Sequence, residues 1–333
     1  MRFVRRSVSL AAVFAIAALT GAAQSSQSDV QKDPKKDPDQ IGSRDVSKGL
    51  NWYSIDKEIA LGKQMAIAVE RSAQIVDDPV IAEYVSRVGQ NLVRNSDAKF
   101  PFTIKVIRDD SPNALSLPGG FFYVNTGLIL TAATEAELAG GMAHEIAHIA
   151  ARHGTRQATR RQVAQLATIP LIFMGGWAGY GARQGAGAVI PVAFLGFDRD
   201  FESEADLLGL EYLYKTGYDP NGMVDIFEKI EALNKAAPGR IAKYFSTHPP
   251  TGDRIVTVQK NIQDLLKSQP QYVVTTSEFS RVQARLSALE NRHKLGPQDD
   301  PNRPTLRRPL DRNLIGVSAR PAALSAPDRR AGI

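Results

Sequence analysis

The chain has 333 residues, of which 43% are hydrophobic and 23% charged, a composition that fits one or two globular domains and excludes a fibrous or wholly disordered protein. It contains no cysteine, which excludes a disulfide scaffold, a thiol nucleophile and cysteine-ligated metal. Residues 1–23 and 296–333 each carry a net charge of +3 and account for the whole formal charge of +6. The body therefore has no basic surplus, and we expect no nucleic-acid partner.

The amino terminus has the order of a secretory signal peptide. Three arginines in the first six residues precede the apolar stretch 7–20 and a small-residue exit, which predicts cleavage after Ala23. The apolar stretch is short for a bilayer span of about 20 residues, so an uncleaved anchor is the less favoured alternative. No cysteine follows to form a lipobox, and we expect a periplasmic or secreted protein. Residues 24–50 are polar and contain proline, which predicts a flexible linker.

Two helices and three short strands are predicted before the middle of the chain. Ser54 is suited to cap the first helix, and Pro79 occupies the first turn of the second. Alternating or β-branched runs then predict strands over residues 102–107, 114–117 and 121–124.

A longer helix begins at the capping box that Thr134 forms with Glu137. We predict that it runs to about His153 and ends at Gly154. Residues 162–182 carry no charge, and residues 175–196 contain seven glycines. This composition favours a glycine-rich lid loop or re-entrant hairpin over the alternative of a transmembrane helix.

Further helices are predicted over about 200–216, 220–236 and 251–268. Residues 269–295 are interpreted as a carboxy-terminal extension. Residues 296–333 are rich in proline and arginine and are predicted to be disordered. Helices outnumber strands, and the strands precede the central helix, which indicates an α+β fold.

An HExxH motif, formed by His144, Glu145 and His148, lies within the capped central helix. Residues four apart share a helix face, so the two imidazoles are placed to bind one zinc ion. Glu145 projects from the neighbouring flank, within reach of a metal-bound water, and is the predicted general base. A helix with two histidines and no metal is the alternative.

A catalytic zinc needs a third protein ligand. Glu202 and Asp206 share a face of the next predicted helix, so the glutamate is a candidate ligand and the aspartate a candidate acceptor for a ligand imidazole. Spacing by itself leaves Glu204 open as the alternative ligand.

Two other histidines receive different predictions. His248 precedes a proline and sits on a loop, where its imidazole either stabilises an oxyanion near the metal or simply belongs to the loop before a helix. His153 would lie about 140° around the central helix from His148, and we expect no metal role for it.

Together these residues resemble the HtpX-like and CAAX-prenyl-protease-like family of zinc metalloendopeptidases, of gluzincin type. The likeness is strongest to soluble periplasmic members that act in outer-membrane protein assembly and quality control. It spans about residues 54–268 and rests on four motifs, NALSLPGGFFYVNTGLI at 113–129, HEIAHIAARH at 144–153, DRDFESEAD at 198–206 and STHPPTGDRI at 246–255.

The resemblance implies a role for each remaining candidate. It selects Glu202 over Glu204 as the metal ligand, and it implies that His248 faces the metal, where it either stabilises the oxyanion or, as in some periplasmic relatives, caps the metal in a resting enzyme. It also implies a substrate-binding role for Arg254 and for an edge strand beside the cleft, made of Asn113, Ala114, Leu115, Ser116 and Leu117. One departure is Asp198, which stands where the family has serine.

We therefore expect a predominantly helical, zincin-like α+β metalloprotease domain over residues 51–268, with one Zn²⁺ per chain and a small β-sheet edge beside the active-site helix. The expected substrate is an extended or unfolded envelope polypeptide, and contact with the membrane surface or the outer-membrane assembly machinery is an accompanying expectation. The alternatives are a periplasmic chaperone or scaffold with a latent zinc site, and a membrane-associated protease.

Overall fold

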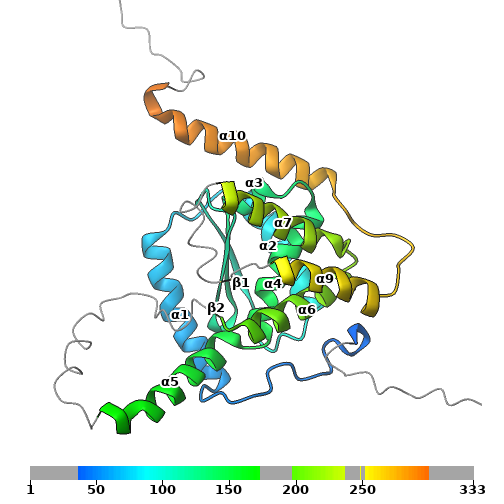
Figure 1. Cartoon of the computed structure of the whole chain (residues 1–333). Helices are drawn as coiled ribbons and strands as arrows, with labels where there is room; N and C mark the ends of the chain where they lie inside the picture. Colours follow the sequence, from blue (N-terminus) through cyan, green and yellow to red (C-terminus); the bar gives the residue numbers. More distant parts are fainter. Residues whose placement is uncertain (1–36, 173–196, 237–247, 249–251, 300–333) are drawn as a thin grey trace, which may run out of the picture. The chain divides into compact units, whose positions relative to one another are not determined.

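A three-stranded sheet lies beside the helices that carry the predicted metal ligands (Figure 1). The computed structural model describes residues 37–172, 197–236, 248 and 252–299. The predicted α+β class, mainly helical with a small sheet, is confirmed. The elements in these ranges are η2 (Pro38–Gln40), α1 (Ile55–Ser72), α2 (Pro79–Arg94), β1 (Thr103–Ile107), β2 (Ala114–Leu117), η3 (Pro118–Gly120), β3 (Phe121–Asn125), α3 (Thr126–Thr131), α4 (Glu135–Ala150), α5 (His153–Ile172), α6 (Arg199–Lys215), α7 (Asn221–Ala236), α9 (Gly252–Leu265) and α10 (Ser277–Asp299).

The sheet has the order β1-β3-β2, in which β1 runs parallel and β2 antiparallel to β3. The tight connection η3 places Gly119 at φ +76° and Gly120 at φ +93°, a left-handed backbone conformation that glycine adopts without strain. Because the strand order is β1-β3-β2, β2 lies at an edge of the sheet. In the part of the chain that the structure describes, it pairs with β3 alone.

Side chains cap the helices where the sequence predicts them. The Ser54 hydroxyl accepts a hydrogen bond from the first turn of α1, and Asp78 does the same for α2. At α4 the Thr134 hydroxyl accepts from the backbone N–H of Glu137 at 3.2 Å, while the Glu137 carboxylate accepts from the N–H of Ala133 at 2.8 Å. These bonds satisfy N–H groups that have no partner inside the helix.

α4 ends earlier than predicted, and the prediction of Gly154 as its terminating residue is wrong. The helix stops at Ala150, and the left-handed residue is Arg152 at φ +57°. A left-handed arginine is unfavourable by itself, but its guanidinium is held by Glu58 at 2.6 Å and by the carbonyl of Tyr53 at 2.6 Å. The chain therefore turns here, and α5 starts a new direction at His153.

α4 is buried along its whole length and packs against α6 and α7. The contact with α6 requires a glycine, since a Cβ added to Gly209 would lie 2.9 Å from the backbone nitrogen of His144. The two helix backbones thus approach closely beside the HExxH motif, which allows side chains from both helices to meet.

The second half of the predicted linker 24–50 packs into the fold. The prediction of a flexible linker is therefore wrong for this half. Arg44 and Val46 are buried. The guanidinium of Arg44 contacts Asp97 at 2.9 Å and Glu211 at 2.5 Å, and both carboxylates have 0% side-chain exposure. A polar stretch of this kind is usually solvated. Here it is fixed to the fold because Arg44 pairs with two buried carboxylates.

This cluster predicts a pH-dependent stability. Burial raises the pKa of Glu211 to about 7, against the opposing effect of Arg44. The folded chain therefore holds a proton that the unfolded chain releases near pH 4.5, and this contribution to stability is lost as pH rises towards 7. Glutamine at this position does not titrate. As pH rises from 4 to 8, we therefore expect the unfolding free energy of Glu211→Gln to increase by up to about 3 kcal/mol relative to that of the parent. Urea unfolding at several pH values measures this, and a constant difference would contradict it.

Residues 269–288, predicted as part of an extension, contact the same body. Val273 forms a parallel β-bridge with Tyr218, and the Gln283 side chain donates to the carbonyls of Ile129 and Ala132. These contacts place the start of α10 against the connection that leads into α4.

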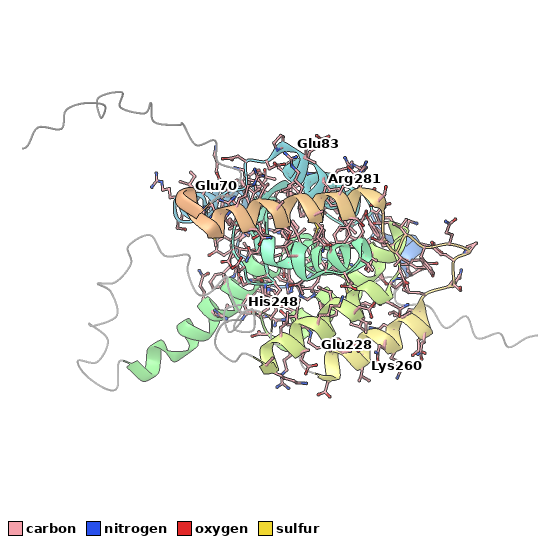
Figure 2. All side chains as sticks on the ribbon, turned by 90° about the horizontal axis from the view of Figure 1, so that it is seen from above. Glu70, Glu83, Glu228, His248, Lys260 and Arg281 are labelled. Atoms are coloured by element: carbon pink, nitrogen blue, oxygen red, sulfur yellow. The ribbon has the colours of Figure 1, made fainter. Side chains whose placement is uncertain are left out.

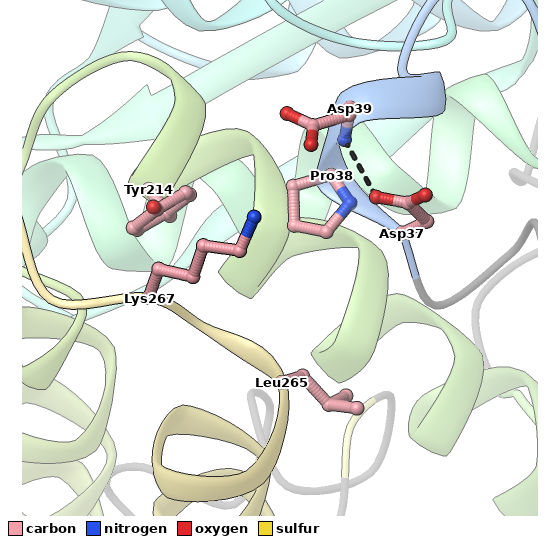
Figure 3. Close-up of a pocket in the computed structure, with 6 residues that line it drawn as sticks. All are labelled: Asp37, Pro38, Asp39, Tyr214, Leu265 and Lys267. Atoms are coloured by element: carbon pink, nitrogen blue, oxygen red, sulfur yellow. Dashed lines mark hydrogen bonds between the residues drawn. The ribbon is translucent and has the colours of Figure 1, made fainter. Parts of the chain in front are cut away.

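A small hollow lies where η2 meets the ends of α6 and α9 (Figure 3). Its volume is about 60 Å³, and its lining includes Asp39, Tyr214 and Lys267. A space of this size holds a few water molecules, so it is not a candidate substrate site.

Several predicted segments lie wholly or mainly outside the described residues, including the signal peptide 1–23, the glycine-rich stretch 175–196 and the tail 296–333. α5 does continue as a helix to Ile172, past Pro170. Among the helices of the described ranges, none combines the length and the apolar content needed to cross a bilayer.

Candidate metal centre

The two histidines of the HExxH motif converge on one point. His144 and His148 project from the same face of α4, and their Nε2 atoms are 3.1 Å apart. Both side chains are 1% exposed. Burial, reinforced by the neighbouring histidines, holds the pKa of His148 well below its ordinary value. The neutral imidazole that results is the form that binds metal ions.

Glu202, on α6, lies beside these two nitrogens. Its Oε2 is 3.6 Å from Nε2 of His144, and its Oε1 is 3.4 Å from Nε2 of His148. Ligands about 2.0–2.1 Å from a tetrahedral zinc are separated by roughly 3.3 Å. The Nε2–Nε2 distance of 3.1 Å and the approach of the Glu202 carboxylate to both nitrogens therefore suit three side chains that share one metal ion. The spacing of the sequence motif left Glu202 and Glu204 as alternative ligands. The structure places Glu202 beside the two imidazoles.

His248, labelled in Figure 2, lies against the same cluster. Its Nδ1 is 2.9 Å from Oε1 of Glu202 and 3.4 Å from Nε2 of His144. Its Nε2 is 3.3 Å from Oε1 of Glu145. The imidazole therefore sits between the candidate base and the candidate ligands.

Glu145 has an environment that a structural carboxylate rarely has. The residue is 1% exposed, its Oε1 pairs with Nε2 of His248 at 3.3 Å, and in the described part of the chain neither oxygen makes a hydrogen bond of regular geometry. Burying a carboxylate with so little hydrogen bonding is costly. Such a carboxylate next to three converging candidate ligands suits a water-activating base beside a metal ion.

A second layer of charges holds the ligands. Oδ1 of Asp206 is 3.0 Å from Nδ1 of His144. Arg254, on α9, contacts Asp206 through two nitrogens at 2.7 and 2.8 Å and Glu202 through a third at 2.7 Å. The guanidinium that was expected to bind substrate thus joins the two carboxylates of α6.

The electrostatics of the centre favour a cation. Burial alone raises the pKa of Glu202, but His248, His144 and Arg254 outweigh it and hold that pKa below its ordinary value. Burial alone lowers the pKa of His248, but the carboxylates of Glu145 and Glu202 outweigh it and raise that pKa to about 9. The Glu202 carboxylate is therefore held in its ionised form, which attracts positive charge to the centre.

His153 and Glu204 lie next to the candidate metal centre. For His153 this differs from the helical-spacing argument, which placed it on another side of the central helix. Nδ1 of His153 is 2.9 Å from Nδ1 of His148, and its Nε2 is 3.2 Å from Oε2 of Glu204. The 140° estimate assumed one continuous helix, whereas the left-handed Arg152 redirects the chain.

The edge strand lies beside a metal ligand. Ser116 and Leu117 of β2 line a small hollow together with His148 and Phe197, and the Phe197 ring stacks on His148 with centroids 4.2 Å apart. The other predicted strand residues, Asn113, Ala114 and Leu115, lead into this hollow along the outer edge of the sheet.

A larger cavity of about 210 Å³ adjoins the cluster at Glu202. Glu202 and Asp206 form one wall, and Arg199, Arg254 and Thr257 lie among its lining residues. It is large enough for an amino-acid side chain.

Comparison with known proteins gives a consistent result. Peptidase family M48 matches residues 79–262. The Beta-barrel assembly-enhancing protease of Escherichia coli strain K12 is 28% identical over 248 residues, which cover 72% of this chain and 50% of that protein. A Vibrio cholerae protein provisionally given the same name is 34% identical over 233 residues, covering 68% of this chain and 47% of that protein.

A more distant organism contributes a third relative. Mitochondrial metalloendopeptidase OMA1 of Schizosaccharomyces pombe is 32% identical over 182 residues, covering 53% of this chain and 52% of that protein. The chain spans about half the length of each of these three relatives.

Proposed function

Because the chain belongs to peptidase family M48, we propose that it is a zinc-dependent endopeptidase that hydrolyses unfolded or misassembled envelope proteins. The observation that supports the proposal is the meeting of His144, His148 and Glu202 near the buried carboxylate of Glu145. The relatives named for β-barrel assembly support an envelope substrate.

The three ligand side chains would hold the metal through two Nε2 atoms and a carboxylate oxygen. When bound, zinc supplies Lewis-acid chemistry, since it polarises a carbonyl and lowers the pKa of water towards about 7. Glu145 takes the proton from the water whose oxygen bonds to the peptide carbonyl carbon. It then gives that proton to the amine nitrogen as the carbon–nitrogen bond breaks. Burial keeps bulk water from competing for the base.

The backbone of Asn113–Leu117 is the proposed binding edge for substrate. An outer strand presents N–H and C=O groups that can pair with an extended peptide, and β2 has such an edge beside His148. Pairing through backbone atoms reads an extended chain more than a particular sequence, which suits unfolded substrates. We propose that the 210 Å³ cavity receives a side chain next to the cleaved bond.

Export through a cleaved signal peptide, residence in the periplasm and contact with outer-membrane assembly machinery are parts of the same proposal. A chaperone or scaffold with a latent metal site is the second candidate, favoured by His248, whose imidazole lies among the metal ligands. Glu145 favours the peptidase, because a purely structural site has no use for a buried base beside the metal ligands.

Metal removal tests the proposal. We expect the purified protein to hold about one zinc per chain and to cleave unfolded β-casein. Removing zinc with a chelator should abolish cleavage, and adding back one equivalent should restore it. Cleavage that persists in zinc-free protein would refute the peptidase mechanism, and a zinc-loaded protein that suppresses aggregation without cutting would support the chaperone.

His248→Ala should raise activity. The imidazole lies between Glu145 and Glu202, where the water and the substrate carbonyl need room, so we propose that it caps the centre in a resting state. We expect β-casein cleavage by the variant to increase several-fold at unchanged zinc content, measured on initial rates. A decrease of about 10-fold or more would instead assign His248 to oxyanion stabilisation.

A further inference from the structure

A continuous line of polar contacts leads away from the metal ligand His148 through His153 to Glu204. The nitrogen–nitrogen distance is 2.9 Å and the nitrogen–oxygen distance is 3.2 Å. We propose that His153 is a positioning residue, which fixes the tautomer and ring orientation of His148 for metal binding and is itself oriented by Glu204. This inference rests on the proposed metal site and assigns it two further residues.

The direction of each hydrogen bond follows from the two ends of the line. If Nε2 of His148 faces the metal, a neutral ring carries its proton on Nδ1. Nδ1 of His153 must then accept that proton, so the proton of His153 sits on its Nε2. At the other end, the Glu204 carboxylate pairs with the Arg156 guanidinium and acts as an acceptor, which also requires a proton on Nε2 of His153. The contacts with His148 and with Glu204 therefore require the same tautomer of His153, with its proton on Nε2.

The surroundings hold His153 in this orientation. Its side chain is fully buried, and its ring stacks on Phe201 with centroids 4.5 Å apart and an angle of 24° between planes. Glu204 is fixed in turn by Arg156, whose Nη1 lies 3.1 Å from its carboxylate and 3.1 Å from the carbonyl of Ala151.

The two ligand histidines are thus supported in different ways. His144 has the Asp206 carboxylate directly at its Nδ1, whereas His148 reaches the carboxylate of Glu204 only through His153. A partner at the second ring nitrogen orients a metal-binding imidazole, and losing it typically lowers metal affinity by about 10–100-fold.

A matched pair of substitutions tests the acceptor itself. Asn and Leu have the same branching, but only Asn offers an oxygen near the position of Nδ1. We expect His153→Leu to weaken zinc binding by about 10–100-fold and His153→Asn to stay within about threefold of the parent. Competition with a chromophoric chelator gives the zinc Kd of each full-length variant, and thermal unfolding of the metal-free proteins compares their folding. Equal losses in both variants, or no loss in His153→Leu, would overturn the inference.

NMR of the unaltered protein gives a second readout that does not depend on the variants folding. In zinc-loaded protein labelled with ¹⁵N-histidine, we expect the proton of His153 on Nε2 and those of His144 and His148 on Nδ1. A proton on Nδ1 of His153 would overturn the inference while leaving the metal site intact. A parent protein that binds no zinc would overturn the proposed function and this inference together.

Discussion

Glu145→Gln should keep the metal and lose the activity. The amide has the size of the carboxylate but cannot take a proton from water, so we expect β-casein cleavage to fall by about 10²–10⁴-fold. Zinc content should stay near that of the parent, because the proposed ligand atoms belong to His144, His148 and Glu202. Initial rates and metal analysis of the same preparations make the comparison.

The control for this experiment is Glu83→Gln, the same chemical change at an exposed position of α2 (Figure 2). It should leave both zinc content and cleavage unchanged. If Glu145→Gln retains more than about a tenth of the parent activity, Glu145 is not the general base. If it loses zinc as well, the variant has disturbed the centre and the loss of activity is then a loss of metal.

Arg44→Met should destabilise the fold strongly. It leaves the carboxylates of Asp97 and Glu211 buried without their cation, and breaking a buried pair in this way costs about 3–5 kcal/mol. We expect the midpoint of urea unfolding at pH 8 to fall accordingly with little change in slope. The loss should shrink near pH 5, where the pKa of about 7 keeps Glu211 protonated.

Arg87→Met provides the matched control. Arg87 pairs with Glu278 at 2.5 Å, the same distance as Arg44 and Glu211, but both side chains are almost half exposed. Surface pairs of this kind contribute about 0–1 kcal/mol. Similar losses in the two variants would mean that burial does not set the strength of the Arg44 cluster.

Local sequence determined the elements that carry the chemistry. Ser54, Asp78 and Thr134 cap helices at the predicted places because capping depends on residues within one turn. The spacing of His144 and His148 determined that both face one point, since residues four apart share a helix face. The resemblance drawn from four motifs is confirmed by the match to peptidase family M48.

The sequence was less informative about ends and edges. Gly154 is the expected residue for a helix end, yet Arg152 takes the left-handed conformation because Glu58 and Tyr53, distant in the chain, hold its guanidinium. Arg44 likewise looks like part of a solvated linker until its two buried acids are known. Both results depend on partners that no local pattern reveals.

Tertiary structure alone decided which groups surround the two histidines. The sequence by itself determined a pair of ligands, a base and a short set of candidates, because these follow from helix geometry. The resemblance already implied Glu202 and His248, but their positions beside the two histidines, and the contact of His153 with His148, depend on how α4, α5 and α6 pack. Packing is decided by many distant contacts at once, among them the close approach that Gly209 permits beside His144, and such contacts have no signature in the spacing of a motif.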